Sequence, residues 1–197
     1  MRSSAFVVGL ILSCSASLAA AAGADNIFGV EMPSSLEDFD AVAYNDAEVD
    51  VAFRKLYASF FFQEKREYGS PELGYSLGYA TPSLEFITMY VYDNGLADIP
   101  NGSEAELIAR ELAVAAEAIE SAGQYGQISE HTAESLSPHF AQVFHMGTAP
   151  SGEAIKSYTL LRGHRDHFIK LRITGATQAL EPRSAAFLEY LAADLGL

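Results

Sequence analysis

The sequence has very little cysteine. Cys14 is the only cysteine among 197 residues, and it lies in the first apolar segment of the chain. If that segment is removed on export, no thiol remains. The mature chain then has no disulfide, no cysteine metal ligand and no cysteine nucleophile.

Basic residues are also scarce, with 12 Lys and Arg against 26 Asp and Glu. Loss of Arg2 with the first segment would leave eleven basic residues and a net charge of −15 with neutral histidines. A field of that sign repels nucleic acid and anionic lipid surfaces. We therefore expect no nucleic-acid partner, and no motif indicates a cofactor.

Long hydrophobic runs are confined to the N-terminus, where residues 1–24 have the pattern of a signal peptide. Arg2 precedes an apolar stretch at residues 5–12 that is too short to span a bilayer, and small residues follow it. Cleavage after Ala22 or Ala24 predicts a periplasmic or secreted protein without a transmembrane segment in the mature chain. The alternative is a lipoprotein anchored through Cys14, because "ILSC" is similar to a lipobox.

The rest of the chain divides into an acidic arm and one domain. Residues 25–50 carry eight acidic residues and no basic one. We therefore expect residues 25–45 to form an acidic N-terminal arm and residues 46–197 a single α+β domain.

The start of this domain can be read in two ways. Asn45 and Glu48 can cap a short helix that carries Val49 and Phe53 on one face, which is the favoured prediction. A strand in which Val49, Val51 and Phe53 alternate with other residues is the alternative.

Alternating apolar residues predict strands in two groups, each followed by a helix. The third strand is apolar on both faces, so we expect it to be central. This order predicts an α+β fold with a mainly antiparallel sheet of about five to six strands covered by helices. The predicted strands cover residues 59–67, 73–80, 85–93, 141–147, 154–162 and 168–175.

Two helices are predicted from their termini. Ser103 and Glu106 match a capping box before a central helix whose apolar stripe includes Ile108, and Gly123 is placed to end it. Pro182 fits the first turn of a C-terminal helix.

Residues 74–78 read GYSLG, the G-x-S-x-G pattern of the hydrolase nucleophile elbow. That chemistry requires a strand, a strained turn and an immediate helix. Pro71 precedes the motif and Pro82 follows it, where it would interrupt such a helix. We therefore expect Ser76 to lie on the smooth face of a strand, with a serine hydrolase using Ser76 as the alternative function.

The histidines offer a further alternative, a metal-binding protein. His139 with His145, and His164 with His167, are the only close pairs. Zinc sites usually need three or four ligands in a fixed geometry, so we do not expect a metal. The five histidines are His131, His139, His145, His164 and His167.

Basic residues gather in the last predicted hairpin, where five lie within 17 positions. Lys170 and Arg172 share the outward face of their strand, opposite an apolar core face. They can form ion pairs with the protein's own acids, or a patch that contacts an anion or a partner. The candidate binding residues are Arg162, His164, Arg165, His167, Lys170 and Arg172.

The stretches "LGYSLGYA", "MYVYDNGLADIP" and "FIKLRIT", with the capped helix between them, resemble a pattern of uncharacterised exported bacterial proteins. More distantly, the order of elements resembles the α/β/α sandwich of PsbP-like domains over residues 58–175. The resemblance implies a fold and an envelope location, and it carries no active site with it.

Together these features predict an exported, non-enzymatic α+β domain that acts as a binding or accessory protein of the cell envelope. An envelope protein or a small anionic ligand would be its partner.

Overall fold

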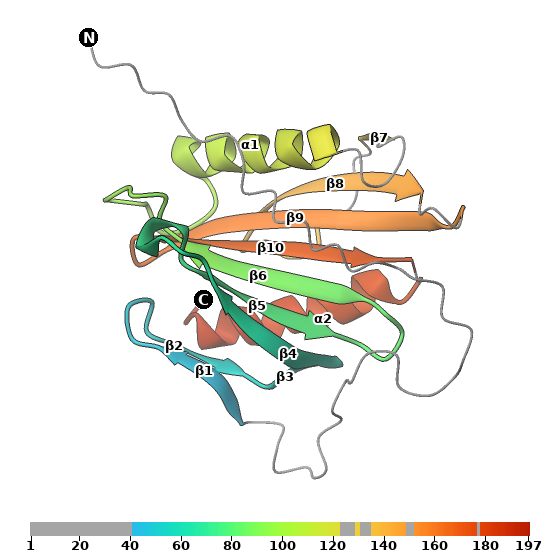
Figure 1. Cartoon of the computed structure of the whole chain (residues 1–197), viewed down its shortest axis with the longest axis horizontal. Coiled ribbons are helices and arrows are strands. Elements are labelled where there is room, and N and C mark those ends of the chain that lie inside the picture. Colours follow the sequence, from blue (N-terminus) through green and yellow to red (C-terminus); the bar gives the residue numbers. More distant parts are fainter. Residues whose placement is uncertain (1–40, 123–128, 131–134, 149–151, 177) are drawn as a thin grey trace.

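The structure, a computed structural model, describes residues 41–122, 129–130, 135–148, 152–176 and 178–197. These residues form an antiparallel sheet of eight strands in the order β3-β4-β5-β6-β10-β9-β8-β7, and a separate hairpin of β1 and β2 (Figure 1). The expected signal peptide lies outside the described residues. The strands are β1 (Val42–Asp46), β2 (Val51–Arg54), β3 (Leu56–Tyr57), β4 (Phe60–Glu67), β5 (Tyr75–Ala80), β6 (Phe86–Tyr92), β7 (Ser129–Glu130), β8 (Ala141–Thr148), β9 (Ala154–His164) and β10 (His167–Gly175).

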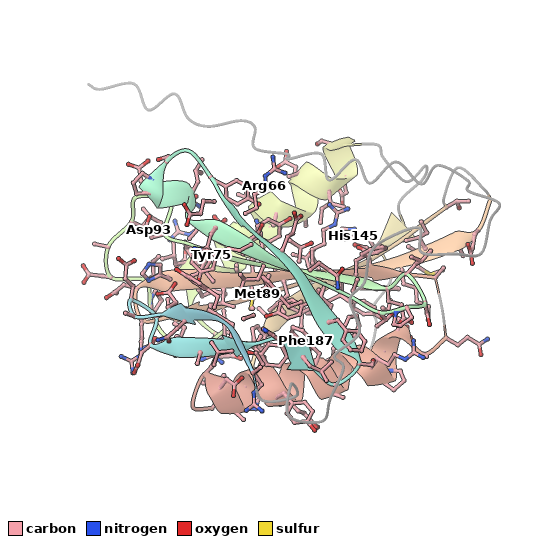
Figure 2. The ribbon with its side chains drawn as sticks, turned by 60° about the horizontal axis from the view of Figure 1, so that its bottom comes forward. Arg66, Tyr75, Met89, Asp93, His145 and Phe187 are labelled. Carbon is pink, nitrogen blue, oxygen red and sulfur yellow. The ribbon has the colours of Figure 1, made fainter. Side chains whose placement is uncertain are left out.

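The two helices lie on opposite faces of the sheet (Figure 1). Helix α1 (Glu106–Ala122) packs Ile108 and Leu112 into a small apolar cluster with β9 and β10. Helix α2 (Leu180–Asp194) and the β1–β2 hairpin cover the other face, where the larger core lies. In Figure 2, Phe187 lies on the α2 side of that core and Met89 lies near its centre.

Alternation along the strands sends side chains to these two faces. On β10, Ile169 and Leu171 belong to the larger core, whereas Phe168 lies in the cluster beneath α1. Lys170 and Arg172 therefore share one face, as the sequence predicts, but it is the face toward α1, and both residues are half-buried there rather than fully outward. Strand β6 pairs with β5 on one side and β10 on the other, which confirms its central position.

The α+β class and the antiparallel sheet are confirmed, but the expected five to six strands are too few. The extra members of the sheet are β3 and β7, each of only two residues. Such short edge pieces leave no periodic pattern in the sequence. Strands β4, β5, β6, β8, β9 and β10 correspond to the predicted runs.

The predicted helix after Asn45 is wrong. The strand alternative is confirmed for Val51 and Phe53, which lie in β2, whereas Val49 lies in the turn before it. Asp46 ends β1, and its Oδ1 accepts hydrogen bonds from the backbone N–H groups of Glu48 (2.8 Å) and Val49 (3.2 Å). This side chain therefore closes a turn rather than a helix. The first strand begins at Val42, inside the segment expected as an arm.

The capping box of α1 is also wrong. The helix begins at Glu106, and the backbone N–H of Ala109 donates a hydrogen bond to the carbonyl of Ala105 at 3.1 Å. Ala105 therefore stands at the start of the helix, where Ser103 was expected. Glu106 lies 3.7 Å from Arg110 instead of reaching back to Ser103. Gly123 lies outside the described residues. Pro182 is the third residue of α2, which confirms its place in the first turn.

Candidate functional site

Ser76 lies within β5, as the strand interpretation of GYSLG predicts. It pairs in register with Arg66 on one side and Tyr90 on the other. Its hydroxyl is buried and accepts a hydrogen bond from Tyr68 Oη at 2.8 Å. A nucleophile elbow places its serine on a strained turn before a helix, and this serine is in the middle of a strand.

The six candidate binding residues occupy three separate places. Arg165 and His167 lie at the β9–β10 turn, and Lys170 and Arg172 lie on the α1 face of the sheet. On β9, residues two apart share a face, so Arg162 and His164 lie on the α2 face with Leu160. The single outward patch expected from the sequence is therefore wrong.

The β9–β10 turn is fixed by its neighbours at one end of the molecule (Figure 1). Arg165 and Asp166 both have positive φ, of 48° and 60°. The backbone N–H of Arg165 donates to Asn101 Oδ1 at 2.7 Å, and its guanidinium lies 2.8 Å from Asp50. Both charged side chains are more than half exposed, at 54% and 69%, so this pair adds little stability.

His167 lies beside the same hairpin. Its Nε2 is 3.7 Å from Glu48, and its Nδ1 is 2.8 Å from the carbonyl of Arg165. The tip of the basic hairpin is thus matched by the acids of the β1–β2 turn. Here the first interpretation of the basic hairpin, ion pairing with the protein's own acids, is correct.

The α1 face of the sheet carries a second group, which we call the tyrosine–lysine face. It is defined by Arg66, Ser76, Tyr90, Tyr92 and Lys170. Arg66, Ser76, Tyr90 and Lys170 pair in register across β4, β5, β6 and β10. In Figure 2, Arg66 lies on the α1 side of the sheet and Phe187 on the opposite side.

Lys170 is held between aromatic rings. Its Nζ lies 4.9 Å from the ring centroid of Tyr90 and 4.9 Å from that of Tyr92. Burial lowers the pKa of Lys170, the charge of Glu111 raises it, and Arg172 lowers it further. The rings replace part of the lost hydration, because an aromatic face attracts a cation.

Glu111 of α1 is the nearest acid in this network, but it serves other donors. Tyr92 Oη donates to its Oε1 at 2.7 Å, and Asn94 Nδ2 donates to the same oxygen at 3.4 Å. Burial and this carboxylate raise the pKa of Tyr92 well above its usual value, so its hydroxyl stays protonated. The arrangement leaves the Lys170 cation without a direct carboxylate contact among the described residues.

Most other cations of the described chain are matched. At least six of its eleven basic residues form ion pairs, Arg172 has an interaction partner as well, and neither Arg66 nor Lys170 is among the six. The six are Arg54, Lys65, Arg110, Lys156, Arg165 and Arg183.

Arg162 and His164 lie in a buried corner on the α2 face. Arg162 is only 4% exposed, and its Nη1 donates to the carbonyl of His139 at 3.2 Å. Its Nε donates to Gly163 O at 3.4 Å, and its guanidinium lies 5.6 Å from the centroid of the Phe140 ring. Burial lowers the pKa of Arg162.

His164 is also buried, and its Nε2 lies 3.1 Å from the carbonyl of Val49. Burial lowers the pKa of His164, and the positive charges of Arg162 and Arg165 lower it further. The hydrogen bond with Val49 and the charge of Asp50 act in the opposite direction. The net lowering of this pKa favours the neutral imidazole, so Arg162 carries the positive charge of the corner.

Metal and membrane functions find no support among the described residues. They contain no group of three or more His, Cys, Asp or Glu placed to hold a metal ion. In the same part of the chain, no helix is both long and apolar enough to cross a bilayer. His131 lies outside the described residues.

Sequence reasoning missed Arg66 and Glu111. The sequence does place Tyr90 and Tyr92 on one face of a strand, but it gives no register that would set them against Lys170. No protein family, curated protein or solved structure matches the chain.

Proposed function

We propose that the chain is an exported, non-enzymatic binding or accessory protein of the cell envelope, which contacts its partner through the tyrosine–lysine face. The observation that carries the proposal is the Lys170 ammonium, which lies between two tyrosine rings and outside the ion pairs of the described chain. The resemblance to exported proteins and to PsbP-like domains remains part of this proposal.

The chemistry of this face favours an acidic partner. Arg66 and Lys170 lie three strands apart, which is about 14 Å at a spacing of about 4.8 Å per strand. Tyrosine and arginine are enriched in protein interfaces, because each combines apolar area with hydrogen-bond donors. An acidic segment of an envelope protein would supply the carboxylates that these two cations lack within the described chain.

The negative charge of the rest of the surface adds specificity for this face. The whole chain has a net charge of −14, which repels acidic partners everywhere except at local basic groups. A partner with acidic side chains is therefore directed toward the few unmatched cations.

The first prediction is that Lys170→Gln with Arg66→Gln weakens retention of an envelope partner. Purified wild-type and variant chains are immobilised and compared for capture of proteins from envelope extract. Retention by the wild type should fall as salt is raised, because salt screens the attraction to the exposed Arg66 and, to a smaller extent, that to the half-buried Lys170. Lys55→Gln is the matched control, since Lys55 is an exposed cation away from this face.

Thermal melts of the same variants separate binding from folding. Loss of a half-buried cation between tyrosines should cost no more than about 1 kcal/mol. Equal capture by the wild type and the double variant would refute the proposed contact face. A large fall in Tm would show instead that Lys170 serves to hold α1 on the sheet.

The second prediction concerns export. A fusion of residues 1–30 to a reporter should be exported and processed, and mass spectrometry should find a new N-terminus between Ala20 and Asp25. A lipid-modified Cys14 at the N-terminus would establish the lipoprotein alternative. Retention of the intact fusion in the cytoplasm would contradict the envelope location.

A further inference from the structure

We propose that Arg162 and His164 form a second binding site, which takes the oxyanion of a small carboxylate or phosphate. This site lies on the α2 face of the sheet, opposite the tyrosine–lysine face. It is independent of the proposed function, because neither Arg66 nor Lys170 contributes to it.

The cost of burying Arg162 is the first argument. A guanidinium taken out of water is unfavourable unless charge and hydrogen bonds compensate it. Arg162 is 4% exposed, yet it forms no ion pair with the described residues, whereas Arg54 and Arg183 are matched by Asp194 and Glu85. Neutral backbone carbonyls and one aromatic ring are its contacts.

The unused donors of Arg162 are the second argument. A guanidinium has five N–H groups, and the bonds to Gly163 O and His139 O use two of them. Neither of these bonds uses Nη2, so three N–H groups of the guanidinium remain for a ligand. Paired N–H groups in a fixed fork match the two oxygens of a carboxylate or phosphate.

The local charge is the third argument. His164 lies two residues along the same face of β9, and the charges of Arg162 and Arg165 both act on it. Asp50 acts on His164 with the opposite sign, but it already pairs with Arg165. An incoming anion would therefore meet the uncompensated positive charge of Arg162 in a strongly acidic protein.

The size of the ligand follows from the burial. His164 is 8% exposed, and its Nε2 is already engaged by Val49 O. Residues this deeply buried exclude a folded surface, so only a small anionic group could reach the remaining donors of Arg162. We therefore assign it a small-molecule carboxylate or phosphate.

Nuclear magnetic resonance of the isotope-labelled full chain tests this site without any mutation. Inorganic phosphate and acetate are titrated separately at constant ionic strength, with sodium chloride as the reference. We expect one of the two anions to cause saturable shifts of the Arg162 Nε–H signal and of the His164 ring signals. Whichever anion saturates distinguishes phosphate from carboxylate recognition. No saturable shift with either anion would overturn the proposal.

Variants then assign the binding to Arg162. Arg162→Gln should weaken anion binding by at least about tenfold. This corresponds to about 1.4 kcal/mol and to the loss of a charge-assisted hydrogen bond. Arg162→Lys keeps the charge without the fork and should weaken it less. Lys55→Gln should leave it unchanged.

Folding defects do not hide the answer. If Arg162→Gln fails to fold, the wild-type titration and the folded Arg162→Lys variant still show whether Arg162 binds the anion. Unchanged affinity in Arg162→Lys together with shifts spread over exposed lysines would show unspecific ion binding and refute the site. Retained anion binding in the Lys170→Gln variant would show that the two sites are separate.

Discussion

Individual buried polar residues fix the arrangement of this core because each is bonded to specific partners. Tyr75 Oη donates to buried Asp46 at 2.5 Å, and Arg183 lies 2.7 Å from Glu85, which is completely buried. Removing Arg183 would leave the buried Glu85 without its counter-charge, which is strongly unfavourable. Against this background, the unmatched charge of Arg162 is the exception that suggests a ligand.

Gly163 provides a prediction for a single residue. A Cβ atom at this position would lie 1.9 Å from the carbonyl oxygen of Pro100, because the loop runs directly over β9. Backbone must therefore move in Gly163→Ala, which should cost about 1–3 kcal/mol, as overpacking typically does. Chemical denaturation measures the loss. Gly69→Ala is the matched control, because its new Cβ would meet nothing within 4 Å.

Equal stability of the two alanine variants would contradict this close approach. The contact also holds the β6–α1 loop, since Gly102 and Gly163 exchange backbone hydrogen bonds of 2.9 and 2.8 Å. A loosened loop in Gly163→Ala should therefore show faster amide exchange at Gly102.

At the residue scale, the sequence predicts which side chains share a strand but not what they face. Because side chains alternate along a strand, the sequence alone places Lys170 on the same face as Arg172, and Tyr90 on the same face as Tyr92. That Tyr90 lies opposite Lys170 depends on the pairing of β6 with β10. This pairing joins segments about 80 positions apart, and no local pattern encodes it.

At the scale of elements, long periodic segments were predictable and short or acidic ones were not. Strand β10 and helix α2 follow their patterns closely. The β1–β2 hairpin was missed because four residues between Asp46 and Val51 look equally well like a helix start. Burial of Val49 and Phe53 against the larger core decides between them, and that burial is a tertiary effect.

The attachment of α2 to β9 gives a prediction of pH dependence. Lys156 lies 2.5 Å from Glu181, and Tyr158 Oη donates to the same carboxylate oxygen at 3.0 Å. Burial alone would raise the pKa of Glu181, but these hydrogen bonds outweigh it and lower the pKa. A lowered folded-state pKa stabilises the protein above the unfolded value, near 4.5, and this contribution disappears as pH falls through the folded-state pKa.

Denaturation curves at several pH values check this sign. Glu181→Gln should be less stable than the wild type at pH 7, by about 1 kcal/mol or less, because the pair is partly exposed. The difference should shrink as pH falls below the unfolded value near 4.5, because the carboxylate is protonated first in the unfolded state and, at lower pH, in the folded state as well. A difference that grows toward acid pH would contradict the assignment. Glu189→Gln, an exposed position on the same helix, serves as the control.

At the scale of the whole molecule, excess negative charge opposes folding. The net charge of −14 cannot be neutralised internally, because only 12 basic residues are present. Bringing these acids together in a compact state costs free energy through self-repulsion. The ion pairs of the described residues act in the opposite direction, but most of them are partly exposed and individually weak.

Salt should therefore raise the stability of the whole molecule. Raising ionic strength from about 10 to 150 mM shortens the Debye length from about 30 to 8 Å, which screens repulsion across the surface. Each 1 kcal/mol gained should raise Tm by about 2–4 °C for a chain of this size.

Two variants that change the net charge in opposite directions separate this repulsion from general salt effects. At low salt, Glu117→Gln with Glu120→Gln on α1 should raise Tm, and Lys55→Gln should lower it. Both differences should fade at 150 mM, because the same screening removes them. If salt lowered Tm instead, the surface ion pairs would outweigh the net repulsion, and the charge balance argued for this protein would be wrong.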